Sequence, residues 1–263
     1  MRLVNAKCPN CGANLKVYDT QETLFCQFCG SSFVVEQAIN NYYITNNVTV
    51  VNQQVNEGFE VVAGILKGYK GAAKDIVIPD NVLEIADSAL EEIDGLTSVV
   101  ISSNVRTIRS YAFYNCRDLK SVIIPNSVTK MEEGVFEGCS SLEKIYFPSS
   151  LTTIPSLTCR HCSSLSAVII PDTVVSIGSF AFEYCKSLHS IVIPSSVTKI
   201  ELDAFSECEK LENVLIQGNP ELESDVFLGT MYYGKQLSLK QSPPSNNITE
   251  TLKKLLKKIK KSS

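Results

Sequence analysis

Apolar residues recur along the central part of this chain with a period of 23 residues. Counted from a proline that keeps the period, apolar side chains occupy positions +3, +6, +10, +11, +14, +17, +20 and +22, as the unit that begins at Pro194 illustrates. Apolar residues at alternate positions close each unit, which is typical of a strand. The pattern therefore predicts an internal repeat with seven strands, near 76–78, 99–101, 122–124, 145–147, 168–170, 191–193 and 214–216.

One such unit is too small to bury its own apolar side. Stacking equivalent units at about 4.8 Å per step would join those sides into one core and align equivalent residues in rows. One row consists of cysteines at the same position of each unit, which we interpret as small buried residues rather than disulfides: Cys116, Cys139, Cys162, Cys185 and Cys208.

The residue two places before each proline position is expected to point away from this core, since side chains alternate along a strand. All members of this outward row are apolar or aromatic: Val77, Val100, Ile123, Tyr146, Ile169, Val192 and Leu215. Six steps of about 4.8 Å would spread them over about 29 Å. We interpret the row as a contact surface for a protein partner, a second copy or the chain's own tail, with strand propensity alone as the alternative.

The repeat motif is [IV]-P-x-S-V-x-x-I-x-x-x-A-F-x-x-C-x-x-L-x-x-[IV]-x-[IV], as in "IPSSVTKIELDAFSECEKLENVLI" from Ile193 to Ile216. It resembles the BspA-like leucine-rich repeat family over about residues 59–229. The resemblance implies an α/β-type curved solenoid, with parallel strands on one face and short helical turns on the other. We expect a hairpin at 58–71 and a degenerate seventh coil at 219–229 to cap its ends. The glycines of the hairpin lack Walker spacing, so a phosphate loop is not expected.

The first four cysteines form a separate pattern, C-x2-C-x14-C-x2-C, made of Cys8, Cys11, Cys26 and Cys29. Two such pairs on tight turns supply four sulfurs to a tetrahedral ion and leave no open position. "CPNCG" and "CQFCG" are similar to the knuckles of a rubredoxin-type zinc ribbon. We therefore predict a ribbon module at 1–36 with one structural Zn²⁺ per chain. Iron and two disulfides are the alternatives.

Charge is unevenly distributed in the 263-residue chain. The net charge is −4, but residues 248–263 hold six lysines and one glutamate, so the rest carries −9. Within this segment Leu252, Leu255, Leu256 and Ile259 follow helical spacing. The predicted basic amphipathic helix could contact an anionic membrane surface, a partner or the acidic body, or be a frayed solubilising end, and its candidate contacts are Lys253, Lys254, Lys257, Lys258, Lys260 and Lys261. Polar linkers are expected at 37–58 and 230–247.

One unit departs from the motif. Cys159 replaces its phenylalanine, which creates Cys159-Arg160-His161-Cys162, the one C-x-x-C outside the ribbon. A redox pair or an extra metal site is conceivable there, but both cysteines fall at inward positions, so we expect a repacked core. His189 stands in a different phase of the repeat from His161, and no nucleophile, base and orienting group can be assembled.

Together these patterns favour a non-enzymatic protein-binding scaffold. No signal peptide and no spanning segment are recognised, which predicts a cytoplasmic protein. Members of the BspA-like class are often surface adhesins, so a bacterial adhesin at the cell surface is the alternative, and it would require export. An acidic body repels nucleic acid, which makes a nucleic-acid-associated ribbon protein the weaker alternative.

Overall fold

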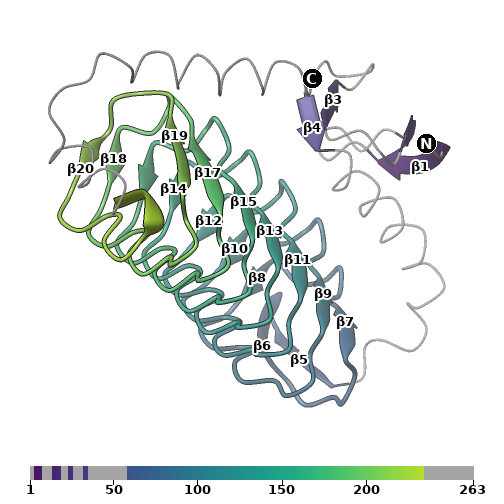
Figure 1. The fold of residues 1–263 in the computed structure, drawn as a ribbon. Coiled ribbons are helices and arrows are strands. Elements are labelled where there is room, and N and C mark those ends of the chain that lie inside the picture. The colour runs from purple at the N-terminus through teal and green to yellow at the C-terminus, as the bar shows by residue number, and fades with distance from the viewer. Residues whose placement is uncertain (1–2, 8–13, 19–22, 26–31, 35–57, 234–263) are drawn as a thin grey trace, which may run out of the picture.

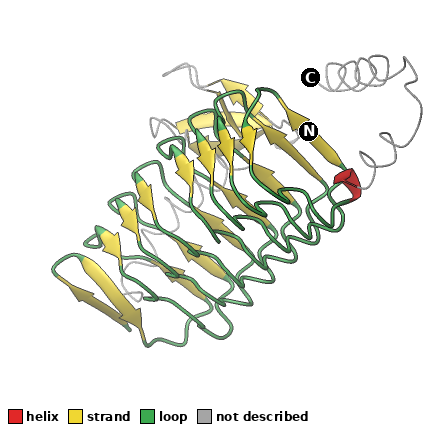
Figure 2. Ribbon diagram, turned by 90° about the vertical axis from the view of Figure 1, so that its left-hand side faces the viewer, coloured by secondary structure: helices red, strands yellow, loops and turns green. Residues whose placement is uncertain are grey.

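The computed structural model describes residues 3–7, 14–18, 23–25, 32–34 and 58–233. Residues 58–233 form an elongated stack of coils in which successive coils lie side by side (Figure 1). Two rows of strands run along the stack and are joined by loops and turns (Figure 2). The predicted solenoid is confirmed.

The longer strands of the solenoid form the first row and pair in parallel within two sheets, one of five strands and one of two. Each partner lies 23 residues away, as in Val122 with Ile145 and Ile191 with Val214. The proline after most of these strands lacks an N–H donor, which ends the pairing. Their bounds begin one residue earlier than predicted: β7 Asp75–Val77, β9 Ser98–Val100, β11 Ser121–Ile123, β13 Lys144–Tyr146, β15 Ala167–Ile169, β17 Ser190–Ile193 and β19 Asn213–Ile216.

A second row consists of two-residue strands that the sequence pattern did not predict. All of them except the last, β20, place the apolar residue at position +6 inward and a mostly polar residue at +5 outward. These strands also pair in parallel, as Ile177 does with Ile200. Their bounds are β8 Glu84–Ile85, β10 Thr107–Ile108, β12 Lys130–Met131, β14 Thr153–Ile154, β16 Ser176–Ile177, β18 Lys199–Ile200 and β20 Glu221–Leu222.

The third side of each coil, about positions +8 to +14, consists of tight turns. Neighbouring coils are hydrogen-bonded here too, for example from Phe113 N to Val135 O (2.9 Å) and from Phe182 N to Ala204 O (2.8 Å). Residues at +9 and +13 adopt left-handed φ, such as Leu157 (60°) and Tyr184 (59°). Left-handed residues interrupt a right-handed helix. The expected short helical turns are therefore not what this side shows: within 58–233 only 231–233 is helical.

The core lies between these three sides and follows the predicted rows. Phenylalanine rings of adjacent coils stack, with ring centroids 5.3 Å apart for Phe113 and Phe136 and 5.2 Å apart for Phe182 and Phe205. All five cysteines of the repeat row have exposed fractions of 0%, and so has Cys159. All six are free thiols, as predicted.

The fourth coil (148–170) has a specific compensation for its missing phenylalanine. Cys159 interrupts the row of stacked rings, so Phe182 has no ring beside it on that side. Phe147, where the other coils carry isoleucine, instead meets Phe182 edge-on with ring centroids 6.2 Å apart. The core of this coil is thus repacked as predicted. A small residue, Cys159, replaces phenylalanine, and a large one, Phe147, replaces isoleucine, so the total side-chain volume is roughly conserved.

The first end of the solenoid is closed by the predicted hairpin. Strand β5 (Phe59–Val62) pairs antiparallel with β6 (Ile65–Tyr69), and β6 continues the second row by pairing with β8. Leu66 is fully buried beneath the first coil. At the other end β20 pairs with β18, so the degenerate seventh coil is present and the chain then turns through 231–233.

Among the described residues, four short strands precede the solenoid in the sequence and form two antiparallel hairpins. Strand β1 (Leu3–Lys7) pairs with β2 (Asn14–Tyr18), and β3 (Thr23–Phe25) pairs with β4 (Ser32–Val34).

Candidate protein-binding surface and zinc module

The seven residues of the predicted outward row lie at equivalent positions of the first row of strands. Register places Val77, Val100, Ile123, Tyr146 and Ile169 opposite one another in turn, and Val192 opposite Leu215. We call this set the strand-face stripe. Ile169 and Val192 are each 47% exposed, and Val77, Val100, Tyr146 and Leu215 are half-buried. These six side chains therefore stand outside the buried core.

Polar residues border the strand-face stripe. At one edge Asp75 Oδ1 accepts hydrogen bonds from Ser98 Oγ (2.6 Å) and Thr97 Oγ1 (2.8 Å). These bonds, that from Ser98 first, lower the pKa of Asp75. At the other edge Asn126 Oδ1 accepts from Ser149 N at 3.1 Å. An apolar centre with a polar rim is the usual anatomy of a protein–protein interface.

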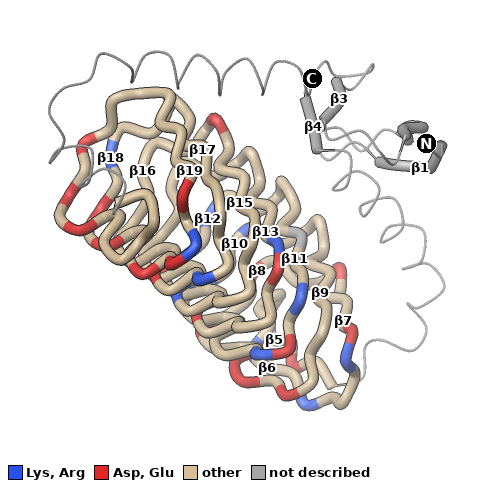
Figure 3. Tube along the Cα trace, viewed as in Figure 1, with Lys and Arg blue, Asp and Glu red and all other residues tan. Residues whose placement is uncertain are grey.

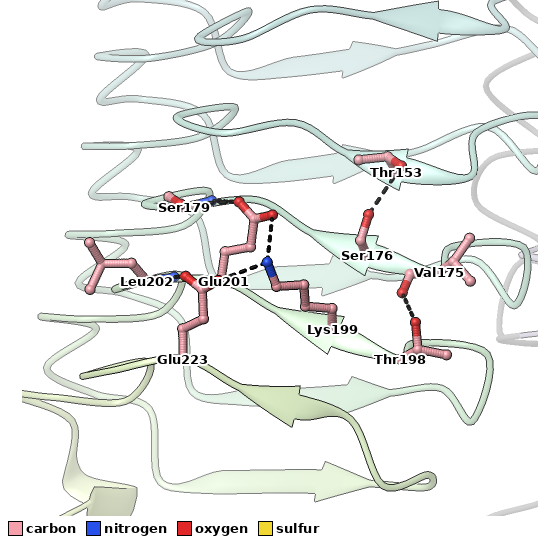
Figure 4. A network of polar contacts seen from close by, with 9 residues as sticks. All are labelled: Thr153, Val175, Ser176, Ser179, Thr198, Lys199, Glu201, Leu202 and Glu223. Atoms are coloured by element: carbon pink, nitrogen blue, oxygen red, sulfur yellow. Dashed lines mark hydrogen bonds and ion pairs between the residues drawn. The ribbon is translucent and has the colours of Figure 1, made fainter.

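The outer face of the second strand row is mainly polar, and several of its charged groups contact one another (Figure 4). Lys199 Nζ lies 2.7 Å from Glu223 Oε1 and 3.5 Å from Glu201 Oε1. Glu201 Oε2 in turn accepts from Ser179 N (3.2 Å), and Glu223 Oε2 accepts from Leu202 N (3.0 Å). The contact to Lys199 is the first cause of the lowered pKa of Glu223. These groups fasten successive coils together.

Arg160 performs a similar task on the turn side. Its Nε lies 2.6 Å from Glu183 Oε2 and its Nη1 lies 3.4 Å from Glu137 Oε1, so one guanidinium joins three successive coils. Both carboxylates are buried. Burial raises the pKa of Glu137, and the neighbouring Arg160 opposes that shift. The repeat pattern contained no sign of this bridge, because Arg160 occupies a position that differs from coil to coil.

The fourth coil does not assemble a reactive centre. Cys159 and Cys162 are fully buried, and burial raises the pKa of Cys159 well above its ordinary value, which keeps the thiol protonated. His161 is exposed and stacks on Tyr184, with ring centroids 4.6 Å apart. The histidine and the thiols therefore face different surroundings, and buried thiols of this kind are chemically inert.

The four cysteines of the predicted zinc site lie outside the described residues, but their place in the chain is informative. Cys8 and Cys11 fall in the connection between β1 and β2, and Cys26 and Cys29 fall between β3 and β4. A C-x2-C pair in the connection between the strands of each of two hairpins is the arrangement that a closed four-thiolate zinc site requires, so the donor set fits Zn²⁺. Among the described residues no cluster of three or more potential metal ligands occurs.

The C-terminal lysines predicted as contacts, from Lys253 to Lys261, also lie outside the described residues. None of the described helices has the length and apolar character needed to cross a membrane.

Comparisons with known proteins agree with the repeat. Residues 69–168 and 152–254 match the BspA type leucine rich repeat region, a description with six copies. The chain belongs to this family. Residues 5–35 match a zinc ribbon domain family, which confirms the predicted N-terminal module. Among curated proteins no relative matches the BspA-type chain.

Solved structures show the same architecture. A leucine-rich repeat protein from Treponema pallidum is 28% identical, with a TM-score of 0.61, and the match covers 73% of this chain and 87% of that one. One from Bacteroides ovatus is 30% identical, with a TM-score of 0.54 and coverages of 59% and 40%. One from Eubacterium ventriosum shares the fold at 24% identity and a TM-score of 0.62; the match covers 67% of this chain and half of that one. The names of these three describe repeat proteins and no ligand.

Proposed function

We propose that this BspA-type protein is a non-enzymatic scaffold that binds another protein through the strand-face stripe. The observation that carries the proposal is the exposure of Ile169 and Val192, two large apolar residues on adjacent coils that are each 47% exposed. Tyr146 and Leu215, the next residues of the row on either side, are aromatic or apolar and half-buried, so the exposed apolar residues are grouped rather than scattered. The polar side chains of the second strand row form hydrogen bonds and ion pairs between coils. The outer face of the first strand row is therefore the better candidate for binding a partner.

The proposal extends to the N-terminal module. The zinc ribbon match and the position of each cysteine pair between the two strands of a hairpin support one structural Zn²⁺ held by Cys8, Cys11, Cys26 and Cys29. A module of this size cannot bury enough apolar surface to fold alone, so the metal would supply folding free energy. Thiolate ligands and the six free thiols of the solenoid suit a reducing compartment, which supports a cytoplasmic location.

The first test compares two double variants. Ile169→Asp with Val192→Asp places two charges in the strand-face stripe. Leu83→Asp with Val175→Asp is the matched control, because these residues are 55% and 42% exposed but lie beside the second strand row. We expect the stripe variant to bind its specific partners with an affinity at least about tenfold lower. The reason is that a charge at the centre of an interface must be desolvated.

Affinity capture with quantitative mass spectrometry measures the loss, and sedimentation reports whether a second copy is the partner. Circular dichroism establishes that both variants remain folded. Equal capture by both variants, with unchanged oligomeric mass, would contradict the proposal.

A further inference from the structure

Within the described part of the chain, the core of the solenoid is less well covered at its C-terminal end than at its N-terminal end. Each inward row ends in a residue that lacks a following coil. In the second strand row Ile200 is fully buried, whereas Leu222, its partner in the last coil, is 45% exposed. In the first row Ile191 and Ile193 are buried, whereas Val214 and Ile216 are only partly buried. The hairpin β5–β6 prevents this at the other end.

The described residues after the last coil close this end only in part. Tyr232 N donates to Leu211 O at 2.8 Å, and the Tyr232 ring lies edge-on against Phe227 with ring centroids 5.3 Å apart. This end of the solenoid also carries exposed apolar side chains. Four are exposed in the last coil and the turn that follows, and we call them the end patch: Leu222 (45%), Leu228 (41%), Met231 (52%) and Tyr233 (38%).

The coils beside the end patch are acidic. Glu221, Glu223 and Asp225 are exposed in the last coil, and Figure 3 shows acidic residues along the edge of the stack near β20. Lys199 pairs with Glu223, but Lys199 also faces Glu201, so negative charge is in excess there. The end of the core therefore offers an apolar centre with an acidic border.

The chain itself carries a segment of matching chemistry. The described part ends at Tyr233, beside the end patch, and 14 residues separate it from residues 248–263. Fourteen residues span up to about 46 Å when extended, so the connection imposes no restriction. Leu252, Leu255, Leu256 and Ile259 fall at i, i+3, i+4 and i+7, and six lysines with one glutamate give the segment a charge of +5.

We propose that residues 248–263 form an amphipathic helix that docks on the end patch and completes the C-terminal cap of the solenoid. Its apolar stripe covers the open ends of the core rows, and its lysines face the acidic border. A second copy of the chain fits less well. Joining two equivalent C-terminal ends would place acidic borders against each other, and the opposite end of the solenoid is already sealed by β5–β6.

Hydrogen–deuterium exchange of the full-length protein tests the docking. Reporter amides lie in the last coil: Glu221 N donates to Thr198 O (2.8 Å) and Glu223 N to Ile200 O (3.0 Å). We expect these amides to exchange at least about tenfold faster in a chain that ends at residue 247, because an uncovered last coil opens more often. Peptides from β9 to β15 provide the internal reference for folding.

A variant with a rearranged sequence in residues 248–263 distinguishes docking through the apolar stripe from attraction between the lysines and the acidic border. The variant Lys254→Leu, Leu255→Lys, Ile259→Lys, Lys261→Leu keeps the charge and the number of apolar residues but places those residues on opposite sides of the helix. We expect it to exchange like the truncated chain. Exchange as slow as in the natural chain, either in the rearranged variant or after truncation, would overturn the proposal. Protection that rises with protein concentration together with a doubled mass would overturn it in favour of a second copy.

Discussion

At the scale of single residues, the cysteine row has a role beyond filling space. Each thiol donates a hydrogen bond to a carbonyl 26 residues earlier: Cys116 Sγ to Leu90 O at 2.9 Å and Cys139 Sγ to Phe113 O at 3.2 Å, for example. The same contact recurs for Cys185 and Cys208. The row thus satisfies a carbonyl in the preceding coil, which explains why a small residue with a donor suits this position.

The buried thiol of Cys116 gives the protein a pH-dependent stability. Burial raises the pKa of Cys116 from 9.0 to about 11, so the folded chain keeps a proton that the unfolded chain loses above pH 9. The contribution of Cys116 to the free energy of unfolding therefore falls as pH rises between about 9 and about 11, by up to about 1.4 kcal/mol per pH unit. We expect Cys116→Ala to show a shallower decline than the natural chain in urea unfolding over this range. Parallel declines would refute the assignment.

At the scale of elements, the turn side depends on residues that tolerate left-handed φ. Most coils use ordinary residues there, but the third coil uses Gly134 (63°) and Gly138 (76°). A Cβ at Gly134 would collide with the ring of Tyr111 from the preceding coil. The Tyr111 ring occupies the space that a side chain at position 134 would need. The two successive coils can therefore pack together in this way only if position 134 is glycine.

Gly134→Ala should therefore cost more than backbone strain alone. Gly95→Ala is the matched control, because Gly95 also has left-handed φ (72°) but no atom within 4 Å of an added Cβ. Alanine in left-handed φ costs about 1 kcal/mol, and the collision adds about 1–3 kcal/mol at Gly134. Chemical denaturation measures both. Adding Tyr111→Ala should remove most of the difference, and a difference that persists would point to another cause.

The elements also differ in how well the sequence predicts them. Row positions such as Phe113, Cys139 and Ile191 follow from the 23-residue period, because stacked units must bury equivalent residues together. The helical turns expected from the family were wrong for this chain: Leu157 and Tyr184 carry no local signal for left-handed φ, which the hydrogen bonds between coils impose. The stripe residues could be placed from alternation alone, but the partner they bind stays a proposal.

At the scale of the whole molecule, two modules depend on different sources of free energy. The solenoid buries a continuous apolar core between residues 66 and 227. The ribbon is expected to depend on a metal ion. The two should therefore respond separately to a change that affects only one of them.

Removal of the metal is the corresponding prediction. A strong chelator should release one zinc per chain and abolish amide protection in residues 1–36, while the solenoid keeps its unfolding midpoint. Cys11→Ser should lower the zinc content in the same way. Cys162→Ser, from the other C-x-x-C, should retain the metal at full stoichiometry. Metal analysis of the purified variants distinguishes these outcomes, and a natural chain without zinc would refute the assignment.

The constant offset between neighbouring coils bears on how such an array can change in length. Pairing always joins positions 23 residues apart from β7 to β18, so a whole coil could be duplicated or lost without shifting any row. The fourth coil is an exception. Its loss would bring Phe136 and Phe182 together while Phe147, which now occupies the gap left by Cys159, would have no space. This pair of positions ties a particular coil to its place in the series.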